Sequence, residues 1–360
     1  MPHDPHIRLF IPGPVDVRPA ILNAQAVPMI GHRSPEYAAL QGRIIPKLQR
    51  LFGTAGRVFI VTSSGSGLQE AAVRNCVGHR CLSLVNGAFG QRWHEVTLAN
   101  GKPADDLQAP WGTAIQPEQL NDRLRTGNYD TVTVVFNETS TGLLNPIPEM
   151  AKVVSRYPDV LLLVDAVSAA GGIEIQADEW RLDVCLTSSQ KALALPPGLA
   201  LCSVSDQAIQ RAHTVPSRGW YFDFLQYDKH SAKNHTPATP AISLMVALDA
   251  QLDAIEDERW KVRFTRHRRL MRQVHDWVTD SEFSFFGEAG YRSPTVTAVD
   301  NTRNMDIGAL NAYLRQRGML IANGYGPLKD KTFRIAHMGD TTEEDISVLL
   351  ETIDSYLAKQ

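Results

Sequence analysis

Short apolar runs alternate with amphipathic segments over the first two thirds of the chain. The runs are rich in Val, Ile and Leu and indicate buried strands at 57–62, 81–85, 131–136, 160–164, 182–186 and 199–203. Helical spacing of apolar residues appears between them at 66–77, 88–99, 117–126 and 147–157. Strands that are apolar along their whole length need cover on both faces. The pattern therefore predicts an α/β large domain of the doubly wound type, with a mostly parallel sheet.

The last third of the chain has a different rhythm. A long amphipathic run from 242 to about 278 follows Pro237 and Pro240, and it predicts one helix that could bridge two domains. Beyond it come strand-like stretches and helical segments at 295–299, 306–317, 332–335 and 342–357. This mixture predicts a small α+β domain. We expect an N-terminal segment at 1–20, a large domain at 21–255 and a small domain at 256–360.

Composition narrows the classes of function. The 360 residues are 43% hydrophobic, and 36 basic and 39 acidic residues are mixed along the chain to a net charge of −3. Without a basic stripe, neither nucleic acid nor a membrane surface is an expected partner. No apolar run approaches the roughly 18 residues that span a bilayer, and the start lacks the pattern of a secretory signal. We expect a cytoplasmic protein, whose four cysteines form no metal or disulfide motif.

A lysine and a carboxylate each follow a predicted strand. Lys191 stands just after the strand near 182–186, where burial would lower its pKa and make its amine a nucleophile. For an arbitrary lysine, a side chain that reaches out to solvent is the more common arrangement. Asp165 ends the strand at 160–164, at the edge where open α/β sheets bind ligands. Taken singly, it is as well explained as a helix N-cap.

A stretch of small residues joins the first predicted strand to a helix. It runs Thr-Ser-Ser-Gly-Ser-Gly from 62 to 67, and its hydroxyls and helix N-terminal N–H groups suit a phosphate. It is neither a Walker loop nor a G-x-G-x-x-G pattern. A serine-rich N-cap explains it almost as well, so only its combination with Lys191 and Asp165 favours a phosphate-bearing cofactor.

Several motifs, in their order along the chain, carry a resemblance to a known family. They are S-G-S-G, N-G-A-F-G-Q-R-W, N-E-T-S-T-G, V-D-A-V-S, S-S-Q-K-A-L-x-x-P-P-G, T-P-A-T-P-A-I-S-L and F-R-I-A-H-M-G. Together they resemble the alanine-glyoxylate and serine-pyruvate branch of the class V aminotransferases, from Pro12 to the last helix. The resemblance implies fold type I, with a seven-stranded sheet, and the cofactor pyridoxal 5′-phosphate.

The resemblance also implies roles for single residues. It makes Lys191 the Schiff-base lysine and proton carrier, and Asp165 the partner of the pyridine nitrogen. Phe89 would stack on the cofactor, where many relatives have tryptophan, and Thr139 would lie beside the ring hydroxyl. The phosphate would be held by Ser64, Gly65, Ser66 and Gln190, and by Thr239 of a second subunit of a homodimer. Some relatives have a tyrosine three residues before that threonine, whereas this chain has Thr236.

Two further positions match residues that bind substrate. Arg334 aligns with the arginine that grips the α-carboxylate, and its planar fork suits a carboxylate; a strand arginine in a surface ion pair is the plain alternative. Gly13, in Pro-Gly-Pro at 12–14, resembles a segment that closes over the substrate. His32 and Arg33 resemble a motif at the dimer edge, and whether they contact substrate stays open.

The expected function is transfer of an amino group by a ping-pong mechanism. The donor would be a small amino acid such as alanine or serine, and the acceptor a 2-oxo acid such as glyoxylate or pyruvate. Alternatives on the same fold are a 2-aminoethylphosphonate or ureidoglycine aminotransferase and a non-catalytic cofactor-binding protein. A cysteine desulfurase is disfavoured, because 323–331 contains no cysteine for its mobile loop.

Overall fold

A seven-stranded sheet carries the larger part of the chain. In the computed structural model, which describes residues 6–359, its strands lie in the order β2 (Arg57–Thr62), β10 (Leu199–Val204), β9 (Val184–Ser188), β8 (Leu161–Asp165), β5 (Thr131–Val135), β3 (Cys81–Val85) and β4 (Ala104–Gln108). Only β10 runs antiparallel to its neighbours in this sheet. The prediction of a mostly parallel sheet is therefore confirmed.

Alternate residues of the strands face two different layers of helices. On β8, Leu161 and Leu163 pack into one apolar core, while Leu162 and Val164 pack into the other. The first core is covered by α3 (Gly65–Cys76), α4 (Ala88–Ala99), α7 (Asp206–Thr214) and α8 (Phe224–Ser231). The second is covered by α1 (Pro19–Asn23), α2 (Pro35–Phe52), α5 (Pro117–Thr126), α6 (Ile147–Val154) and α9 (Ile242–Glu258). This two-sided cover explains why the strands are apolar along their length.

The pattern missed β4, and the reason is its place in the sheet. Its sequence, Ala-Asp-Asp-Leu-Gln, has no apolar run, and its residues are only partly buried. As the edge strand beside β3, it pairs on one side only, and charged side chains are common on such edges.

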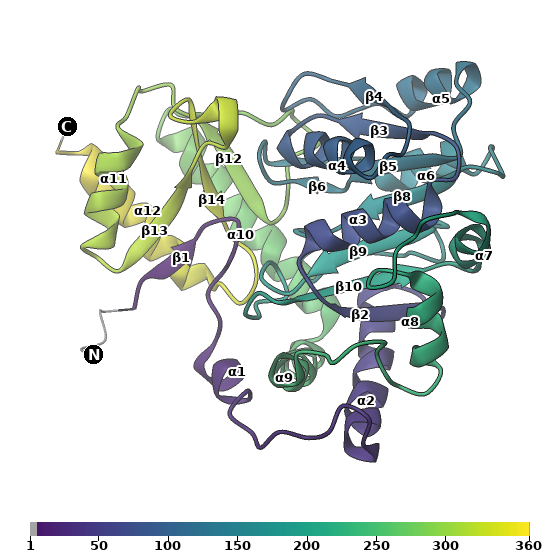
Figure 1. The fold of residues 1–360 in the computed structure, drawn as a ribbon. Coiled ribbons are helices and arrows are strands. Elements are labelled where there is room, and N and C mark those ends of the chain that lie inside the picture. The colour runs from purple at the N-terminus through teal and green to yellow at the C-terminus, as the bar shows by residue number, and fades with distance from the viewer. Residues whose placement is uncertain (1–5, 360) are drawn as a thin grey trace.

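The smaller sheet joins the two ends of the described chain. Its order is β1 (Arg8–Phe10), β13 (Met319–Asn323), β14 (Thr332–Ala336), β12 (Val296–Asp300) and β11 (Ser284–Phe285). A third core lies between this sheet and α10 (Trp260–Asp280), α11 (Ile307–Arg315) and α12 (Glu343–Leu357). Figure 1 shows this part beside the larger sheet, with β1 crossing to it from the N-terminal side.

The N-terminal segment and the remaining short elements complete the chain. Strand β1 pairs in parallel with β13, so the expected segment at 1–20 contributes a strand to the smaller sheet; its residues 1–5 lie outside the described residues. A small hairpin is formed by β6 (Asn137–Glu138) and β7 (Leu143–Leu144), and a 3-10 turn, η1, covers Gly326–Leu328. Between residues 6 and 359, no helix is long and apolar enough to cross a membrane.

The expectation of one continuous helix from 242 to about 278 is wrong. The run is divided into α9 and α10 at Arg259, whose φ of 70° is left-handed. The two helices pack against different cores: Leu252 of α9 lies in the larger one and Leu270 of α10 in the smaller one. Because the helix axis changes where the chain passes between cores, a continuous apolar rhythm in the sequence conceals the break.

A buried ion cluster fastens the two parts together. The side chain of Arg263 on α10 is 1% exposed and donates to the carbonyls of Gly171 and Ala192 at 2.9 and 2.8 Å. Its remaining nitrogen contacts the carboxylates of Glu258 and Asp340 at 2.8 and 2.9 Å. Ala192 directly follows Lys191, so this arginine also anchors the backbone beside the lysine.

The cluster generates a prediction about stability. Arg263→Met should lower the free energy of unfolding by about 3–5 kcal/mol, because it removes the buried partner of Glu258 and leaves Asp340 with only the more exposed Arg18 as its cation. Urea unfolding at neutral pH measures the loss. The matched control is Arg269→Met on the same helix, whose exposed pair with Glu343 contributes about 1 kcal/mol or less.

The contribution of the Arg263–Asp340 ion pair to the free energy of unfolding should also depend on pH. Burial pushes the pKa of Asp340 up, but Arg263 and Arg18 outweigh it and hold that pKa below its usual value. The stability is therefore present above the ordinary aspartate pKa of about 4 and is lost as the pH falls through the lowered one. Equal losses in the Arg263 and Arg269 variants at neutral pH would contradict this account.

Candidate active site

A cavity opens where the parallel strands end. It is bordered by the residues that follow β2, β5, β8 and β9, at the carboxyl edge where open α/β sheets bind ligands. Most of the site residues chosen from the sequence line it: Ser64, Gly65, Ser66, Phe89, Thr139, Asp165, Gln190 and Lys191. Segments far apart in sequence are thus brought to one site.

The Lys191 amine points into this cavity. Its Nζ donates a hydrogen bond to the carbonyl of Pro12. Its pKa is lowered to about 8, chiefly by burial and also by the charges of Arg334 and Arg92, while Asp165 opposes this shift. An amine with such a pKa is neutral in part near neutral pH, which is the form that acts as a nucleophile or takes up a proton. Lys191 therefore does not reach out to solvent, which was the alternative arrangement considered from the sequence.

Asp165 is buried at the end of β8, with its carboxylate facing the same cavity. Its Oδ1 accepts from the backbone N–H of Val167 at 2.8 Å, and its Oδ2 accepts from the Gln69 amide at 2.6 Å. Burial raises the pKa of Asp165 to about 6, although both hydrogen bonds lower it. Neither of these partners carries a charge. A cationic group in the cavity would therefore find an uncompensated carboxylate here.

Gln69 is a residue that the sequence analysis missed. It lies on α3 one turn after Gly65, so its side chain faces the cavity beside the start of that helix. Trp93 donates its indole N–H to the backbone carbonyl of Gln69 at 3.2 Å. The amide of Gln69 orients Asp165. The helical spacing from the small-residue stretch was the signal that could have found it.

The cavity carries polar groups that need a partner. Ser64 is the N-cap residue of α3, yet its side chain makes no capping hydrogen bond. Among the described residues, the buried Ser188 hydroxyl and the Gln190 Oε1 also have no hydrogen-bond partner. Buried polar groups are nearly always paired in native proteins. This end of the cavity is therefore suited to a polar ligand.

Glu138 determines where Phe89 lies. Its side chain is fully buried, and its Oε2 accepts from the N–H groups of Phe89 and Gly90 at 3.0 and 3.1 Å, in the first turn of α4. Its Oε1 accepts from the Ser140 hydroxyl at 2.6 Å. A carboxylate at a helix N-terminus satisfies free donors and complements the helix dipole. Burial raises the pKa of Glu138, which these hydrogen bonds oppose.

The Arg334 guanidinium is buried on β14 and forms no ion pair with any residue from 6 to 359. It is 7% exposed and donates three hydrogen bonds to two backbone carbonyls. One goes to Thr139 at 3.1 Å, and two go to Asn323 at 3.1 and 3.0 Å. Burial lowers its pKa to about 10. Since three of five N–H donors are used, two stay available to an anion. The residue does not line the cavity wall itself, but its charge acts on Lys191.

Gly13 lies directly against Lys191. Its φ is 97°, and a Cβ at this position would lie 2.8 Å from the lysine Nζ. Any larger residue would be strained and would displace the amine. Val15, two residues on, donates its N–H to the Gln190 carbonyl at 3.2 Å. The N-terminal segment therefore covers the lysine side of the cavity.

Arg92 and Tyr325, like Gln69, are residues near the cavity that the sequence analysis missed. Arg92, on α4, lines the cavity and donates to the Tyr325 hydroxyl at 2.8 Å. Its Cζ lies 4.9 Å from the centre of the Phe89 ring, and the Arg334 Cζ lies 5.6 Å from that of Tyr325. Tyr325 belongs to the loop between β13 and β14. Only the tertiary fold brings that loop to α4.

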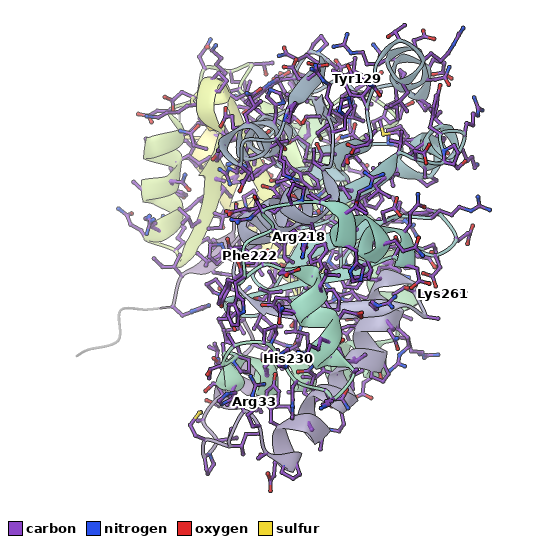
Figure 2. All side chains as sticks on the ribbon, turned by 45° about the vertical axis from the view of Figure 1, so that its right-hand side comes forward. Arg33, Tyr129, Arg218, Phe222, His230 and Lys261 are labelled. Atoms are coloured by element: carbon purple, nitrogen blue, oxygen red, sulfur yellow. The ribbon has the colours of Figure 1, made fainter. Side chains whose placement is uncertain are left out.

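Thr239, His32 and Arg33 are not in this cavity. Thr239 is exposed, in the stretch before α9, and Arg33 donates to the carbonyls of Thr236 and Pro237 at 2.6 and 3.0 Å. Figure 2 shows Arg33 and His230 on one face of the molecule, below Phe222 and Arg218. Arg33 therefore holds the Thr239 stretch in place at the surface.

The cysteines are excluded from the chemistry of this cavity. All four are free and buried, and none of them lines it. Burial raises the pKa of Cys81 and that of Cys202 to about 12, so both thiols stay protonated. A desulfurase nucleophile is not found among the residues of this site.

Comparisons with known proteins agree with this geometry. The family model described as aminotransferase class-V matches residues 47–349. The chain is 36% identical to an uncharacterized aminotransferase of Methanocaldococcus jannaschii over 96% of this chain and 91% of that one. It is 30% identical to a serine–glyoxylate aminotransferase of Methylorubrum extorquens, over 93% and 87%. A solved alanine–glyoxylate aminotransferase from a Nostoc species superposes with a TM-score of 0.94 at 28% identity, over 99% and 97%.

These matches cover nearly the whole chain, and the solved structures share its fold type I architecture. The order of motifs that the sequence displays is thus that of a family. The chain belongs to the class V aminotransferases and is a pyridoxal-phosphate-dependent transaminase.

Proposed function

We propose that this enzyme transfers the amino group of a small amino acid, such as alanine or serine, to a 2-oxo acid such as glyoxylate or pyruvate, by a ping-pong mechanism. The observation that carries the proposal is that the Lys191 amine and the Asp165 carboxylate open into one cavity. The names of the matched serine–glyoxylate and alanine–glyoxylate aminotransferases support the choice of substrates.

The residues present fit the cofactor. Ser64 and Ser66, with the free N–H groups at the start of α3, and the side-chain NH₂ of Gln190 would hold the phosphate by donating hydrogen bonds to it. Asp165 would face the ring nitrogen, with Phe89 alongside the ring and Thr139 near its hydroxyl. When bound, the cofactor supplies an aldehyde carbon that bonds an amine and a ring that accepts the electron pair of a substrate α-carbon.

Lys191 would hold the cofactor and then move a proton. Its pKa of about 8 leaves neutral amine available near neutral pH, and the freed Nζ can take the α-proton of the substrate. The Pro12 carbonyl orients this amine by accepting its hydrogen bond. Gly13 lets the N-terminal segment approach closely enough to exclude water from that side.

Arg334 would bind the α-carboxylate of either substrate. Its three bonds to backbone carbonyls fix the guanidinium plane, and the two remaining N–H groups can donate to one carboxylate. Asp165 would stabilise positive charge on the ring nitrogen throughout, because its own hydrogen-bond partners are neutral.

We also propose a cytoplasmic homodimer in which Thr239 of each subunit completes the phosphate site of the other. Support comes from apolar side chains that a single chain leaves exposed: Leu22 at 46%, Met29 at 64% and Trp220 at 58%. Tyr221, beside Trp220, donates to the Thr62 carbonyl near the start of α3, so the exposed Trp220 belongs to a segment that lies against the proposed phosphate end of the cavity. Exposed apolar patches of this kind are typical of subunit interfaces.

The covalent role of Lys191 is tested by trapping. After borohydride reduction of the holoenzyme, peptide mass spectrometry should find the cofactor on Lys191 in the wild type and nowhere in Lys191→Ala. Lys229→Ala, an exposed lysine on α8, is the control and should label as the wild type does. Labelling of another lysine in the wild type would overturn the assignment.

Asp165→Asn should still bind the cofactor but should slow the half-reaction with alanine by about 100-fold or more, because a neutral amide cannot stabilise charge on the ring. Stopped-flow absorbance measures the rate. The control is Asp183→Asn, a second buried carboxylate, which bonds Leu162 and Ser205 away from the cavity. Equal slowing in both variants would point to a structural effect instead.

Arg334→Gln should lower kcat/KM for alanine by about 10- to 100-fold, because a charged hydrogen-bond pair to the substrate carboxylate is lost. Arg334→Lys keeps the positive charge but lacks the planar guanidinium, so its kcat/KM for alanine should lie between those of the wild type and Arg334→Gln. Cofactor affinity, measured by titration of the apoenzyme, should change little. An unchanged kcat/KM in the glutamine variant would remove Arg334 from substrate binding.

A further inference from the structure

Two side chains close the base of the loop between β13 and β14, and the proposed transfer uses neither of them. Asn323, the last residue of β13, donates from its side-chain NH₂ to the Asp330 Oδ1 at 2.7 Å. Its own Oδ1 accepts the backbone N–H of Asp330 at 2.8 Å and that of Gly324 at 2.6 Å. Asn323 and Asp330 thus bond to each other in both directions across the loop, and this pair is termed the loop clamp.

The backbone at Asp330 has the conformation that such a pair supports. Its φ is 63°, in the left-handed region, which Gly, Asn and Asp adopt more readily than other residues. Its N–H is bonded to Asn323, and its carbonyl accepts from the Asn301 side-chain amide at 3.0 Å. Asp330 is therefore held from both sides, although its side chain lies at the surface.

The backbone carbonyl of Asn323 holds the Arg334 guanidinium. It accepts from Nε and Nη2 of Arg334 at 3.1 and 3.0 Å, which occupies one edge of the group. The Thr139 carbonyl accepts from Nη1 at 3.1 Å. Each of the two terminal nitrogens therefore keeps one N–H, and this pair can donate to the two oxygens of a carboxylate.

The direction of that N–H pair depends on the direction of the Asn323 carbonyl. The carbonyl and the clamping side chain belong to one residue, so a backbone rotation that turns the carbonyl also strains the bonds to Asp330 and Gly324. Arg334 is buried, but its partners are carbonyls and not carboxylates. Since no charge partner fixes the guanidinium, the geometry of these carbonyls fixes it.

We propose that Asn323 is a positioning residue for substrate. Through the loop clamp it fixes its own carbonyl, and this carbonyl orients Arg334 toward the α-carboxylate. The proposal rests on the function given above and adds a residue that does not touch the substrate. Both the amino acid and the 2-oxo acid carry the carboxylate in question, so the clamp should influence the affinity for both. It should leave proton transfer at Lys191 and cofactor binding nearly unchanged.

The half-reaction with alanine separates affinity from rate. Stopped-flow absorbance of the holoenzyme, over a range of alanine concentrations, gives an apparent dissociation constant and a limiting rate. Asn323→Ala should raise the dissociation constant by about 5- to 10-fold, because the hydrogen bonds that fix the carbonyl are lost. The limiting rate and the cofactor affinity of the apoenzyme should stay within about twofold of the wild type. Lys329→Ala, at an exposed position of the same loop, is the matched control and should behave as the wild type.

An exchange of the two clamp residues tests their hydrogen bond directly. Asn323→Asp alone places a second carboxylate opposite Asp330 and should raise the dissociation constant at least as much as Asn323→Ala. Adding Asp330→Asn restores one amide and one carboxylate, with the donor on the opposite side, and returns the net charge to that of the wild type. Asparagine also tolerates the left-handed φ. The double variant should therefore bind alanine within about threefold of the wild-type affinity.

A third combination shows whether the clamp acts through Arg334. In the Arg334→Gln background, Asn323→Ala should cause no further loss of alanine affinity, because the group that it positions is already absent. A full additional loss there would overturn the positioning role. So would an equal fall in limiting rate and affinity in Asn323→Ala, which would indicate a general disturbance of the fold.

The outcomes separate this proposal from the function on which it rests. If Arg334→Gln weakens alanine binding and Asn323→Ala does not, the role of Asn323 falls and the general function stands. If Arg334→Gln itself leaves alanine binding unchanged, the substrate-binding role of Arg334 falls, and that of the clamp falls with it. If no amino acid is transaminated and Lys191 carries no cofactor, the proposed function itself is overturned.

Discussion

Parallel strands of one sheet end at a common edge, and the chemistry of this protein depends on that constraint. Residues after β2, β5, β8 and β9 converge there although more than a hundred positions separate the first from the last. Burial at this edge raises the pKa of Asp165 and lowers that of Lys191, since each charged form is deprived of water. The sheet therefore both collects the reactive groups and prepares their protonation.

The N-termini of α3 and α4 both lie at the cavity, but their free N–H groups have different partners. At α4, Glu138 occupies the N–H groups of the first turn, which fixes Phe89 and leaves no room there for an anionic ligand. At α3, Ser64 makes no capping bond, and the first turn stays open to a phosphate. The start of α4 is thus occupied by a carboxylate of the chain itself, while the start of α3 is left free for a ligand.

The smaller sheet brings a second set of cationic and aromatic side chains toward the cavity. It brings Arg334 on β14, and Tyr325 on the loop before that strand, toward α4, where Arg92 donates to the Tyr325 hydroxyl. Arg263 ties the same half of the molecule to the carbonyl of Ala192, next to Lys191. The position of Lys191 and that of Arg334 are therefore set by one interface, and small movements of the two halves would change both together.

The sequence by itself determined six of the seven strands of the large sheet and the positions of Lys191 and Asp165, because continuous apolar runs and polar residues at their ends are local features. Its ordered motifs also identified the family. Only the tertiary structure decided that α9 and α10 separate at Arg259, that β1 joins β13, and that Arg92 meets Tyr325. These features depend on which core each segment packs against and on contacts between distant segments, and no local pattern of hydrophobic and polar residues encodes them.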